Sequence, residues 1–395
     1  MTSGDLAFPS SRYGHRRAAQ VVLVGRELRH SLSFALRLSQ NALGDVVQAS
    51  SMPERIRSAD PEADRALLTY LLSQSLGPAA GDRRYEWLYL ENPHGRARAW
   101  LATEGDTGRG LGAAAAFPRT LLVRGSVCHG YVLGDFCIDP HHRSLGLALQ
   151  LQRVCLEQIT STPLLLAYDF PSDRMMAIYR RMRISPAGQM VRWAKPLRAN
   201  RKIANLVGSP TLAGLLAAPV NELLAWKDFA SLPSGGWTIV GHDGICMEEF
   251  THLAHSVGSR YGSCVERSAE YLNWRYLRHP LVHHELLAAR RGGELRGYVV
   301  FSHTNEDAKI VDLFGFSDTA MWTALVSRVV SLVRERGVAT LSISALASSP
   351  WAGLLKGWGF RPREVAQVVV YAPGIMAGPD GDASSCFLMD GDRES

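Results

Sequence analysis

Apolar and polar residues follow two different periods along the chain, and these periods predict strands and helices in turn. In the first half, short alternating or continuous apolar runs predict strands over 54–59, 97–103, 110–118, 128–139, 163–170 and 189–196. Helical spacing of apolar residues predicts helices over 61–77, 144–157 and 172–182. From residue 236 onward, strands are predicted over 236–242, 285–291, 297–302, 309–316, 339–346 and 365–373, with a last one near 384–390. Helices are predicted there over 247–258, 319–337 and 349–360. This mixture predicts α/β or α+β layers in each half.

The order of elements is repeated within the chain. "WLYLENP" at 87–93 and "WRYLRHP" at 274–280 share the pattern W-x-Y-L-x-x-P, and each is preceded by a strand and a helix and followed by a strand pair. Five elements in the same order predict two copies of one α/β unit. We therefore expect a first domain over 52–197, a helical linker over 198–235 and a second domain over 236–395. Trp87 and Trp274 are most simply explained as core anchors.

Composition narrows the class of protein. The 395 residues are 46% hydrophobic and 20% charged, which is typical of globular domains. The net charge is +6, and residues 1–51 hold six arginines against three acidic residues, so we expect a basic, flexible leader there. The sequence contains no block of Lys and Arg residues that would indicate a nucleic-acid-binding surface. The uncharged stretch 203–221 contains Gly, Pro and Asn, which disfavours a stable membrane span. Six cysteines without a C-x-x-C pair and the lack of a secretory signal predict reduced thiols in the cytoplasm.

The stretch "IDPHHRSLGLALQLQRVCLEQI" at 138–159 carries candidate chemistry. A strand is expected to end near Asp139 and a helix to begin around Gly146, because the following residues are good helix formers. Unpaired N–H groups at the helix start, the missing side chain of Gly146 and the charge of Arg143 suit a pyrophosphate. A zinc site is the weaker alternative, because the adjacent His141 and His142 point apart and no third ligand lies at metal spacing.

This stretch resembles the acyl-CoA loop of the GCN5-related N-acetyltransferases (GNAT), V/I-x-P-x-x-R-x-x-G-x-A/G, with Arg143, Gly146 and Ala148 at the motif positions. "IYRRMRI" at 178–184 resembles the later Y-x-K-x-G-F segment of that family, although Arg183 and Ile184 replace Gly-Phe. The second half keeps "KGWGF" at 356–360 but has Leu355 in place of the tyrosine and no R-x-x-G-x-A. The resemblance implies two tandem GNAT-like domains, each a mixed, mostly antiparallel sheet flanked by helices, with a degenerate second half.

The resemblance also implies site residues. Acetyl-CoA, the expected co-substrate, would contact the residues Phe136, Cys137, Ile138, Arg143, Ser144, Leu145, Gly146, Leu147 and Ala148. Backbone N–H groups over 136–138 would hold the thioester carbonyl. Asp135 is the first candidate for the general base and His129 the second, while Tyr179 would protonate the leaving thiolate. No metal is implied.

The resulting expectation is an acyl-CoA-dependent N-acyltransferase that acts on a primary amine of a small molecule or amino sugar, in surface-polysaccharide metabolism as a family-level hint. A non-catalytic acyl-CoA-binding scaffold and a Fem-type aminoacyl transferase, which takes its acyl group from charged tRNA, are the alternatives. The sequence leaves the acceptor, the acyl group and the oligomeric state open.

Overall fold

The computed structural model describes residues 54–77, 81–105, 107–142, 144–159, 166–199, 203, 207, 216–222, 236–372 and 386–394. The predicted leader, most of the predicted linker and Arg143 lie outside the described residues. Residues 54–395 form one compact unit.

In the described part of the first half there are six strands with helices between them, and the elements predicted there are confirmed. The strands are β1 (Glu54–Ala59), β2 (Arg98–Glu104), β3 (Gly110–Val123), β4 (Ser126–Ile138), β5 (Leu166–Asp169) and β6 (Gly188–Pro196). The helices are α2 (Arg65–Leu76), α3 (Asp82–Tyr85), the π-helix η2 (Glu86–Leu90), the short η3 (Pro140–His142), α4 (Leu145–Ile159) and α5 (Asp173–Arg181).

The second half follows the same order. Its strands are β7 (Thr238–Gly241), β8 (Ser263–Val265), β9 (Glu285–Arg291), β10 (Glu294–His303), β11 (Asp307–Gly315), β12 (Thr340–Leu346), β13 (Arg361–Tyr371) and β14 (Cys386–Phe387). Its helices are α8 (Glu248–Gly258), α9 (Ala269–Leu272), the π-helix η4 (Asn273–Leu277), α10 (Thr319–Glu335), α11 (Ala352–Gly357) and the short η6 (Asp390–Asp392). The strand β8 and both π-helices were not predicted from the sequence.

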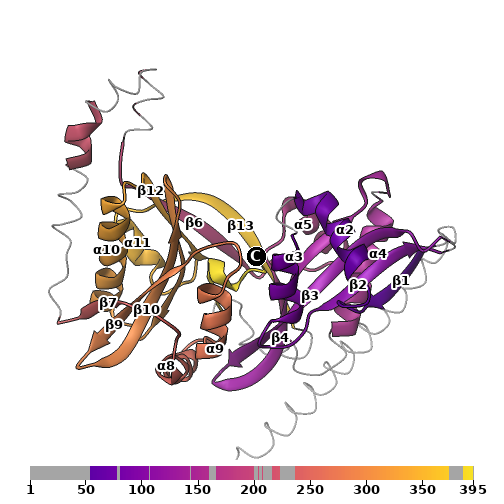
Figure 1. Ribbon diagram of the computed structural model, residues 1–395, viewed down its shortest axis with the longest axis horizontal. Helices are drawn as coiled ribbons and strands as arrows, with labels where there is room; N and C mark the ends of the chain where they lie inside the picture. Colours follow the sequence, from indigo (N-terminus) through magenta and orange to yellow (C-terminus); the bar gives the residue numbers. More distant parts are fainter. Residues whose placement is uncertain are drawn as a thin grey trace, which may run out of the picture. The chain divides into compact units, whose positions relative to one another are not determined.

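A single sheet runs through both halves, in the order β1-β2-β3-β4-β5-β13-β6-β12-β11-β10-β9-β7. Most neighbours are antiparallel, whereas β4–β5 and β11–β12 are parallel. The last long strand of each half pairs with a strand of the other half (Figure 1). Strand β13 of the second half pairs with β5 of the first, and strand β6 of the first half pairs with β12 of the second. Pairing between strands thus joins segments on the two sides of the predicted domain boundary at residue 197. The division into two domains remains a prediction.

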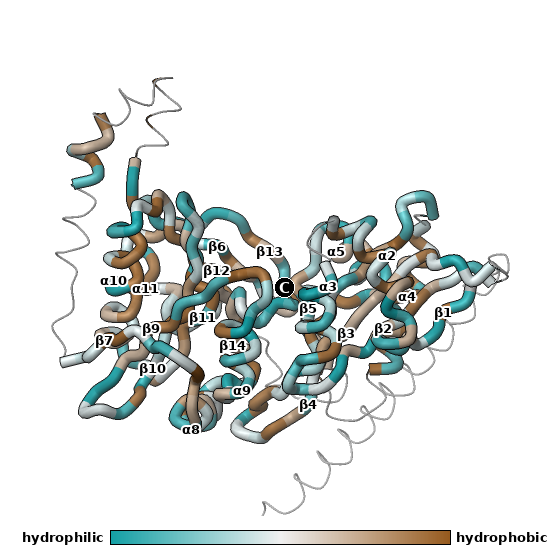
Figure 2. Tube along the Cα trace, in the orientation of Figure 1, coloured by the Kyte–Doolittle hydropathy of each residue, from teal (hydrophilic) through white to brown (hydrophobic). Residues whose placement is uncertain are grey.

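Helices cover the sheet through their apolar faces. In α10, Met321, Leu325, Val329 and Val333 recur at helical spacing and are fully buried against the second-half sheet. The side chain of Asp318 accepts a hydrogen bond from the Met321 N–H and so caps the start of this helix. In Figure 2, hydrophobic residues, drawn in brown, occur along the strands and along the helices that pack on them. The apolar periodicity that predicted the helix is thus the face that the helix buries.

The repeated W-x-Y-L motif forms both π-helices and joins the two halves. Trp87 and Trp274 stack with ring centroids 4.7 Å apart and an interplanar angle of 18°. The Nε1 of each tryptophan donates a hydrogen bond of 3.0 Å to the backbone carbonyl of the other. Both side chains are buried, which confirms the prediction that they are core anchors. The repeat is therefore a reciprocal contact between the halves.

Two further observations concern the described part of the chain. None of its helices is long and apolar enough to cross a bilayer. All six cysteines are free of disulfides.

Candidate active site

The first-half sheet opens between β4 and β5. These parallel strands pair only from Gly130 with Leu166 to Val132 with Tyr168, and β4 then continues to Ile138 paired with β3 but no longer with β5. A β-bulge interrupts β4 at this point, because Ala115 pairs with Gly134 and Ala113 with Cys137. Two residues of β4 thus face one residue of β3, which leaves backbone N–H groups out of the ladder. The bulge begins one residue before the 136–138 stretch predicted to hold the thioester carbonyl.

The side chain of Asp135, at the bulge, is engaged in a buried ion pair. Both of its oxygens accept hydrogen bonds of 2.8 Å from Arg84, and one also accepts a bond of 3.0 Å from the Tyr89 hydroxyl. The side chain is 2% exposed. Its backbone φ of 48° is left-handed, and such strain, on the order of 1–3 kcal/mol, persists only where surrounding contacts hold it. Protonating Asp135 would break its ion pair with Arg84, so the geometry disfavours Asp135 as the general base. Its role as general base remains a prediction.

Tyr179 lies in a second buried polar cluster, with Asp169 and Gln152. Its hydroxyl donates a hydrogen bond of 2.7 Å to Asp169 Oδ2 and accepts one of 3.2 Å from Gln152 Nε2. Ser172, which accepts a hydrogen bond from the Met175 N–H, caps α5 and so fixes the helix that carries Tyr179. Burial raises the pKa of Tyr179 well above its usual value, and Asp169 raises it further.

Asp169 is a candidate base that the sequence analysis missed. It ends β5, where the strands part, and it is 8% exposed. Burial raises its pKa to about 7; the hydrogen bond from Tyr179 opposes that rise, and the nearby carboxyl of Glu394 adds to it. A carboxyl group with a pKa near 7 can accept a proton at neutral pH and release it again. The available signal was a carboxylate at the end of a strand, in "AYDF".

The predicted pair of Asp135 and Tyr179 is not brought together. Tyr89, which bonds Asp135, belongs to one apolar cluster, together with the side chains of η2 and second-half side chains such as Trp274. Tyr179 belongs to another, together with the side chains of α4 and α5. The two predicted catalytic side chains therefore point toward different layers, and they could meet a common substrate only where β4 and β5 part.

The end of the described chain also reaches this opening. Glu394 packs against Gly134, since a Cβ added to that glycine would lie 2.5 Å from Glu394 Cγ. Oε2 of Glu394 is buried without a hydrogen-bond partner among the described residues. Burial raises the pKa of Glu394, and Asp135 raises it further. The Arg393 guanidinium lies 4.5 Å from the ring centroid of Phe170, directly after β5.

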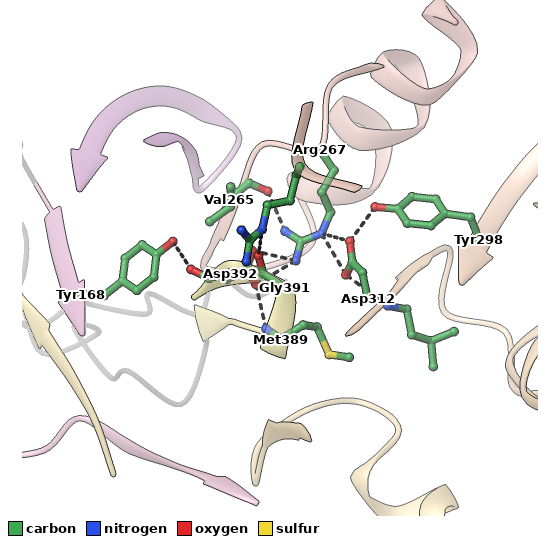
Figure 3. A network of polar contacts seen from close by, with 10 residues as sticks. Tyr168, Val265, Arg267, Tyr298, Asp312, Met389, Gly391 and Asp392 are labelled. Carbon is green, nitrogen blue, oxygen red and sulfur yellow. Dashed lines mark hydrogen bonds and ion pairs between the residues drawn. The ribbon is translucent and has the colours of Figure 1, made fainter. Parts of the chain in front are cut away.

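A buried ion network holds this segment in place (Figure 3). Arg267 lies between Asp312 and Asp392 at 3.1 and 2.9 Å, and all three side chains are fully buried. Tyr298 donates a hydrogen bond of 2.9 Å to Asp312, and Tyr168 of β5 donates one of 3.0 Å to the backbone carbonyl of Asp392. The network thus ties residues 389–392 to both halves, which places Glu394 at the bulge.

A helix follows the predicted phosphate-binding loop, as expected. Helix α4 begins at Leu145, and its Leu147 N–H donates a hydrogen bond of 3.2 Å to Ser144 Oγ. A Cβ added to Gly146 would meet nothing within 4 Å, so open space lies in front of it. Asp139 precedes the loop, bonded by the His141 N–H at 2.8 Å and by Arg109 at 3.1 Å. Arg143 lies outside the described residues.

The other predicted contact residues divide into two groups. Phe136, Ile138 and Leu145 keep part of their surface exposed, whereas Cys137, Leu147 and Ala148 are buried. Burial raises the pKa of Cys137 to about 12, so its thiol is unreactive. His129, the second candidate base, is exposed on β4 opposite Thr120, six residues before Asp135. Within the described ranges, no three His, Cys, Asp or Glu side chains are grouped to hold a metal ion.

Comparison with known proteins supplies the fold. No protein-family model matches the chain, and no curated protein sequence matches it. Solved structures do match. The GCN5-related N-acetyltransferase from Anabaena variabilis ATCC 29413 matches with a TM-score of 0.59 and 14% identity, over 80% of this chain and 72% of that one.

The fold is that of the GCN5-related N-acetyltransferases. A second member, from Kribbella flavida, has a TM-score of 0.55 at 14% identity, over 82% of this chain and 72% of that one. The N-myristoyltransferase of Saccharomyces cerevisiae, solved with bound myristoyl-CoA, has a TM-score of 0.50 at 13% identity, over 82% and 84% of the two chains. The predicted fold class is confirmed, whereas the tandem arrangement and the degeneracy of the second half remain predictions.

Proposed function

We propose that the protein is an acyl-CoA-dependent N-acyltransferase, with acetyl-CoA as the expected donor and a primary amine of a small molecule or amino sugar as the acceptor. The observation that carries this proposal is the opening between β4 and β5, with a bulge on one strand and the buried Asp169–Tyr179 pair at the end of the other. The cytoplasmic location and a role in surface-polysaccharide metabolism belong to the same proposal.

The donor thioester lies in the opening, with its carbonyl oxygen on backbone N–H groups freed by the bulge. Such preorganised donors stabilise the oxyanion that forms when an amine attacks, typically by about 3–4 kcal/mol for one donor. The pyrophosphate lies at the start of α4, where helix N–H groups and the dipole favour negative charge. Gly146 leaves room for that group.

Proton transfer runs through Asp169. As the amine nitrogen bonds to the thioester carbon, Asp169 accepts its proton, directly or through a water molecule. The carbon–sulfur bond then breaks, Tyr179 gives its proton to the thiolate, and Asp169 returns a proton to Tyr179. The hydrogen bond of 2.7 Å between the two side chains supports this relay. Asp135 keeps Arg84 and the bulge in position.

In the second half, β11 and β12 also part beyond Ile310 and Ile343, but buried side chains fill the space beside Asp312. Asp312 stands beside a register shift of β11, much as Asp135 stands at the bulge of β4. Arg267 and the Asp392 side chain occupy the space against Asp312, and all three are fully buried. This packing supports a single donor site, in the first half.

Calorimetric titration with acetyl-CoA tests the donor site. We expect micromolar binding to the wild type, and its loss in Arg143→Ala and Gly146→Glu. Gly353→Glu is the matched control, because a Cβ at either glycine meets nothing within 4 Å. Absence of binding to the wild type would refute both the acyl-CoA proposal and the acyl-CoA-binding scaffold, and would leave the Fem-type transferase.

Turnover tests the chemistry. Asp169→Asn and Tyr179→Phe should bind acetyl-CoA as the wild type does and lose about 100-fold or more in kcat, as is common when a general base or acid is removed. Acetyl-CoA binding with unchanged kcat in both variants would place proton transfer elsewhere. Binding without any turnover in the wild type, across a screen of amines, would favour the non-catalytic scaffold.

A further inference from the structure

A pocket of about 290 Å³ lies beside the proposed donor site, and we call it the inner pocket. Arg84, Trp87, Tyr276 and Gly391 are among the residues that line it. A larger hollow of about 790 Å³, the outer pocket, shares four lining residues with it: Leu281, Val282, Ser302 and Lys309. The two pockets are therefore neighbours separated by these shared side chains, and we refer to them together as the channel.

The inner pocket reaches the bulge of β4 through two contacts. Arg84 lines the pocket, and the same guanidinium binds Asp135 at the bulge with two bonds of 2.8 Å. Gly391 lines the pocket too, and Glu394, three residues further on, packs against Gly134. A molecule in the inner pocket is thus one side chain away from the place proposed for the thioester.

Cations outnumber carboxylates among the lining residues of the channel. Its described lining residues include five Lys or Arg side chains and two carboxylates, namely Arg84, Arg192, Arg275, Lys309 and Arg363 against Asp307 and Asp390. Asp135 and Glu364 pair with two of these cations from outside the lining, and Asp390 pairs with Lys309. A guanidinium has five N–H donors and an ammonium group three, which is more than each of these ion pairs uses.

Two histidines of the inner pocket have lowered pKa values. Burial lowers the pKa of His279 to about 3 and that of His284 to about 4, and the charge of Arg275 lowers both. Both rings are therefore neutral at physiological pH. The hydroxyl of Tyr276, which is 2% exposed, has no hydrogen-bond partner within the described residues. A buried hydroxyl of this kind is costly unless a ligand or water pairs with it.

We propose that this channel binds the acceptor, and that the acceptor is an amine carrying an anionic group, either a carboxylate or a phosphate. The proposal rests on the N-acyltransferase function and narrows its substrate class. The amine points toward the bulge past Arg84, and the anion lies against Lys309 and the arginines of the outer pocket. Leu281 and Val282, 57% and 40% exposed, form an apolar lip over which the body of the acceptor lies.

Matched pairs of amines test the charge of the acceptor. Tryptophan against tryptamine varies a carboxylate, and O-phosphoethanolamine against ethanolamine varies a phosphate. Each is titrated into the full-length protein by calorimetry without acyl-CoA, and each is then assayed with acetyl-CoA for release of free thiol. We expect at least one member that carries the anionic group to bind and react about tenfold or more better than its partner without that group. The pair that responds distinguishes carboxylate from phosphate.

Charge variants locate the anion. Lys309→Met and Arg363→Glu should lower the affinity for the preferred amine with an anionic group about tenfold, and should not lower the affinity for its partner without that group. Arg363 is exposed, so its substitution tests the site even if loss of the Lys309–Asp390 pair disturbs folding. Lys356→Glu, exposed on α11 and outside both pockets, is the control for net charge.

The outcomes separate this proposal from the function on which it rests. Amines without the anionic group that bind and react as well as the partners that carry it would overturn the acceptor class and leave the acyltransferase intact. Anionic amines that bind at Lys309 in a protein that does not bind acetyl-CoA would overturn the function and keep the anion site. Equal effects of the variants on both members of a pair would overturn the placement of the anion.

Discussion

Asp169 allows a direct test of the proposed base, because its burial costs stability in a pH-dependent way. Its pKa is raised from 3.8 to about 7. The native state therefore holds the proton more tightly than the unfolded chain does. The stability associated with this carboxyl is fully present below about pH 4 and is lost as the pH rises toward 7. A difference of about 3 pKa units corresponds to about 4 kcal/mol of unfolding free energy.

Asp169→Asn removes this loss, because the amide has nearly the same shape and does not ionise. Its oxygen can still accept the hydrogen bond from Tyr179. We expect the variant and the wild type to have similar unfolding free energies near pH 4, and the variant to be more stable by about 4 kcal/mol near pH 8. A substitution that lowers kcat about 100-fold would thus raise the unfolding free energy, as is common where an active site contains a buried charge that destabilises the fold.

Urea unfolding of both proteins across this pH range measures the difference. Each carboxyl that is unchanged between the two proteins contributes equally to both, apart from Glu394, which lies close enough to influence Asp169. Asp243→Asn, at an exposed turn, is the control for loss of a carboxylate. A difference that does not change with pH, or a wild type more stable than the variant near pH 8, would refute the reasoning. Asp169 would then be ionised at neutral pH without a penalty, and a base with its pKa near 7 would have to be sought elsewhere.

The remaining predictions concern rate and stability. The pH profile of kcat/KM should rise to a plateau with an apparent pKa near 7, and this acid limb should be absent from the residual activity of Asp169→Asn; a limb that persists would identify another base. Trp274→Ala should lower the unfolding free energy by about 3–5 kcal/mol in urea, because the stack on Trp87 and a reciprocal hydrogen bond are lost; a loss below about 1 kcal/mol would contradict the packing. Arg267→Met should cost about 3–5 kcal/mol by leaving two buried carboxylates without their cation, whereas Arg290→Met, at a partly exposed pair, should cost about 0–1 kcal/mol; equal losses would argue against the buried network.

Local elements were predictable where apolar residues follow one period over a whole segment. The helix over 319–337 and the strands over 285–291 and 339–346 agree with the structure to within two residues. The π-helices were missed because a π-turn differs from an α-turn by one residue in hydrogen bonding, and not in composition. β8 was missed because three residues are too few to establish an alternation.

The site was predictable in its location and less so in its residues. The strand, loop and helix around 138–147 follow from residue types that are close in sequence. Asp135 was a reasonable candidate from its strand, but its pairing with Arg84, 51 residues away, is a tertiary contact that no local pattern indicates. Asp169 has a raised pKa only because its surroundings bury it, and burial of a single carboxyl is not visible in the sequence.

The sequence by itself determined most of the helices and strands and the W-x-Y-L-x-x-P repeat, and it predicts an anion-binding loop before α4. These properties depend on neighbouring residues, whose spacing fixes periodicity, helix starts and charge. The tertiary structure alone decided that β6 and β13 pair across the halves and that Trp87 meets Trp274. It also decided that the last described residues reach the bulge of β4. The physical reason is that each of these contacts joins segments separated by more than a hundred residues, and only the packing of the whole chain selects among the partners that local patterns allow.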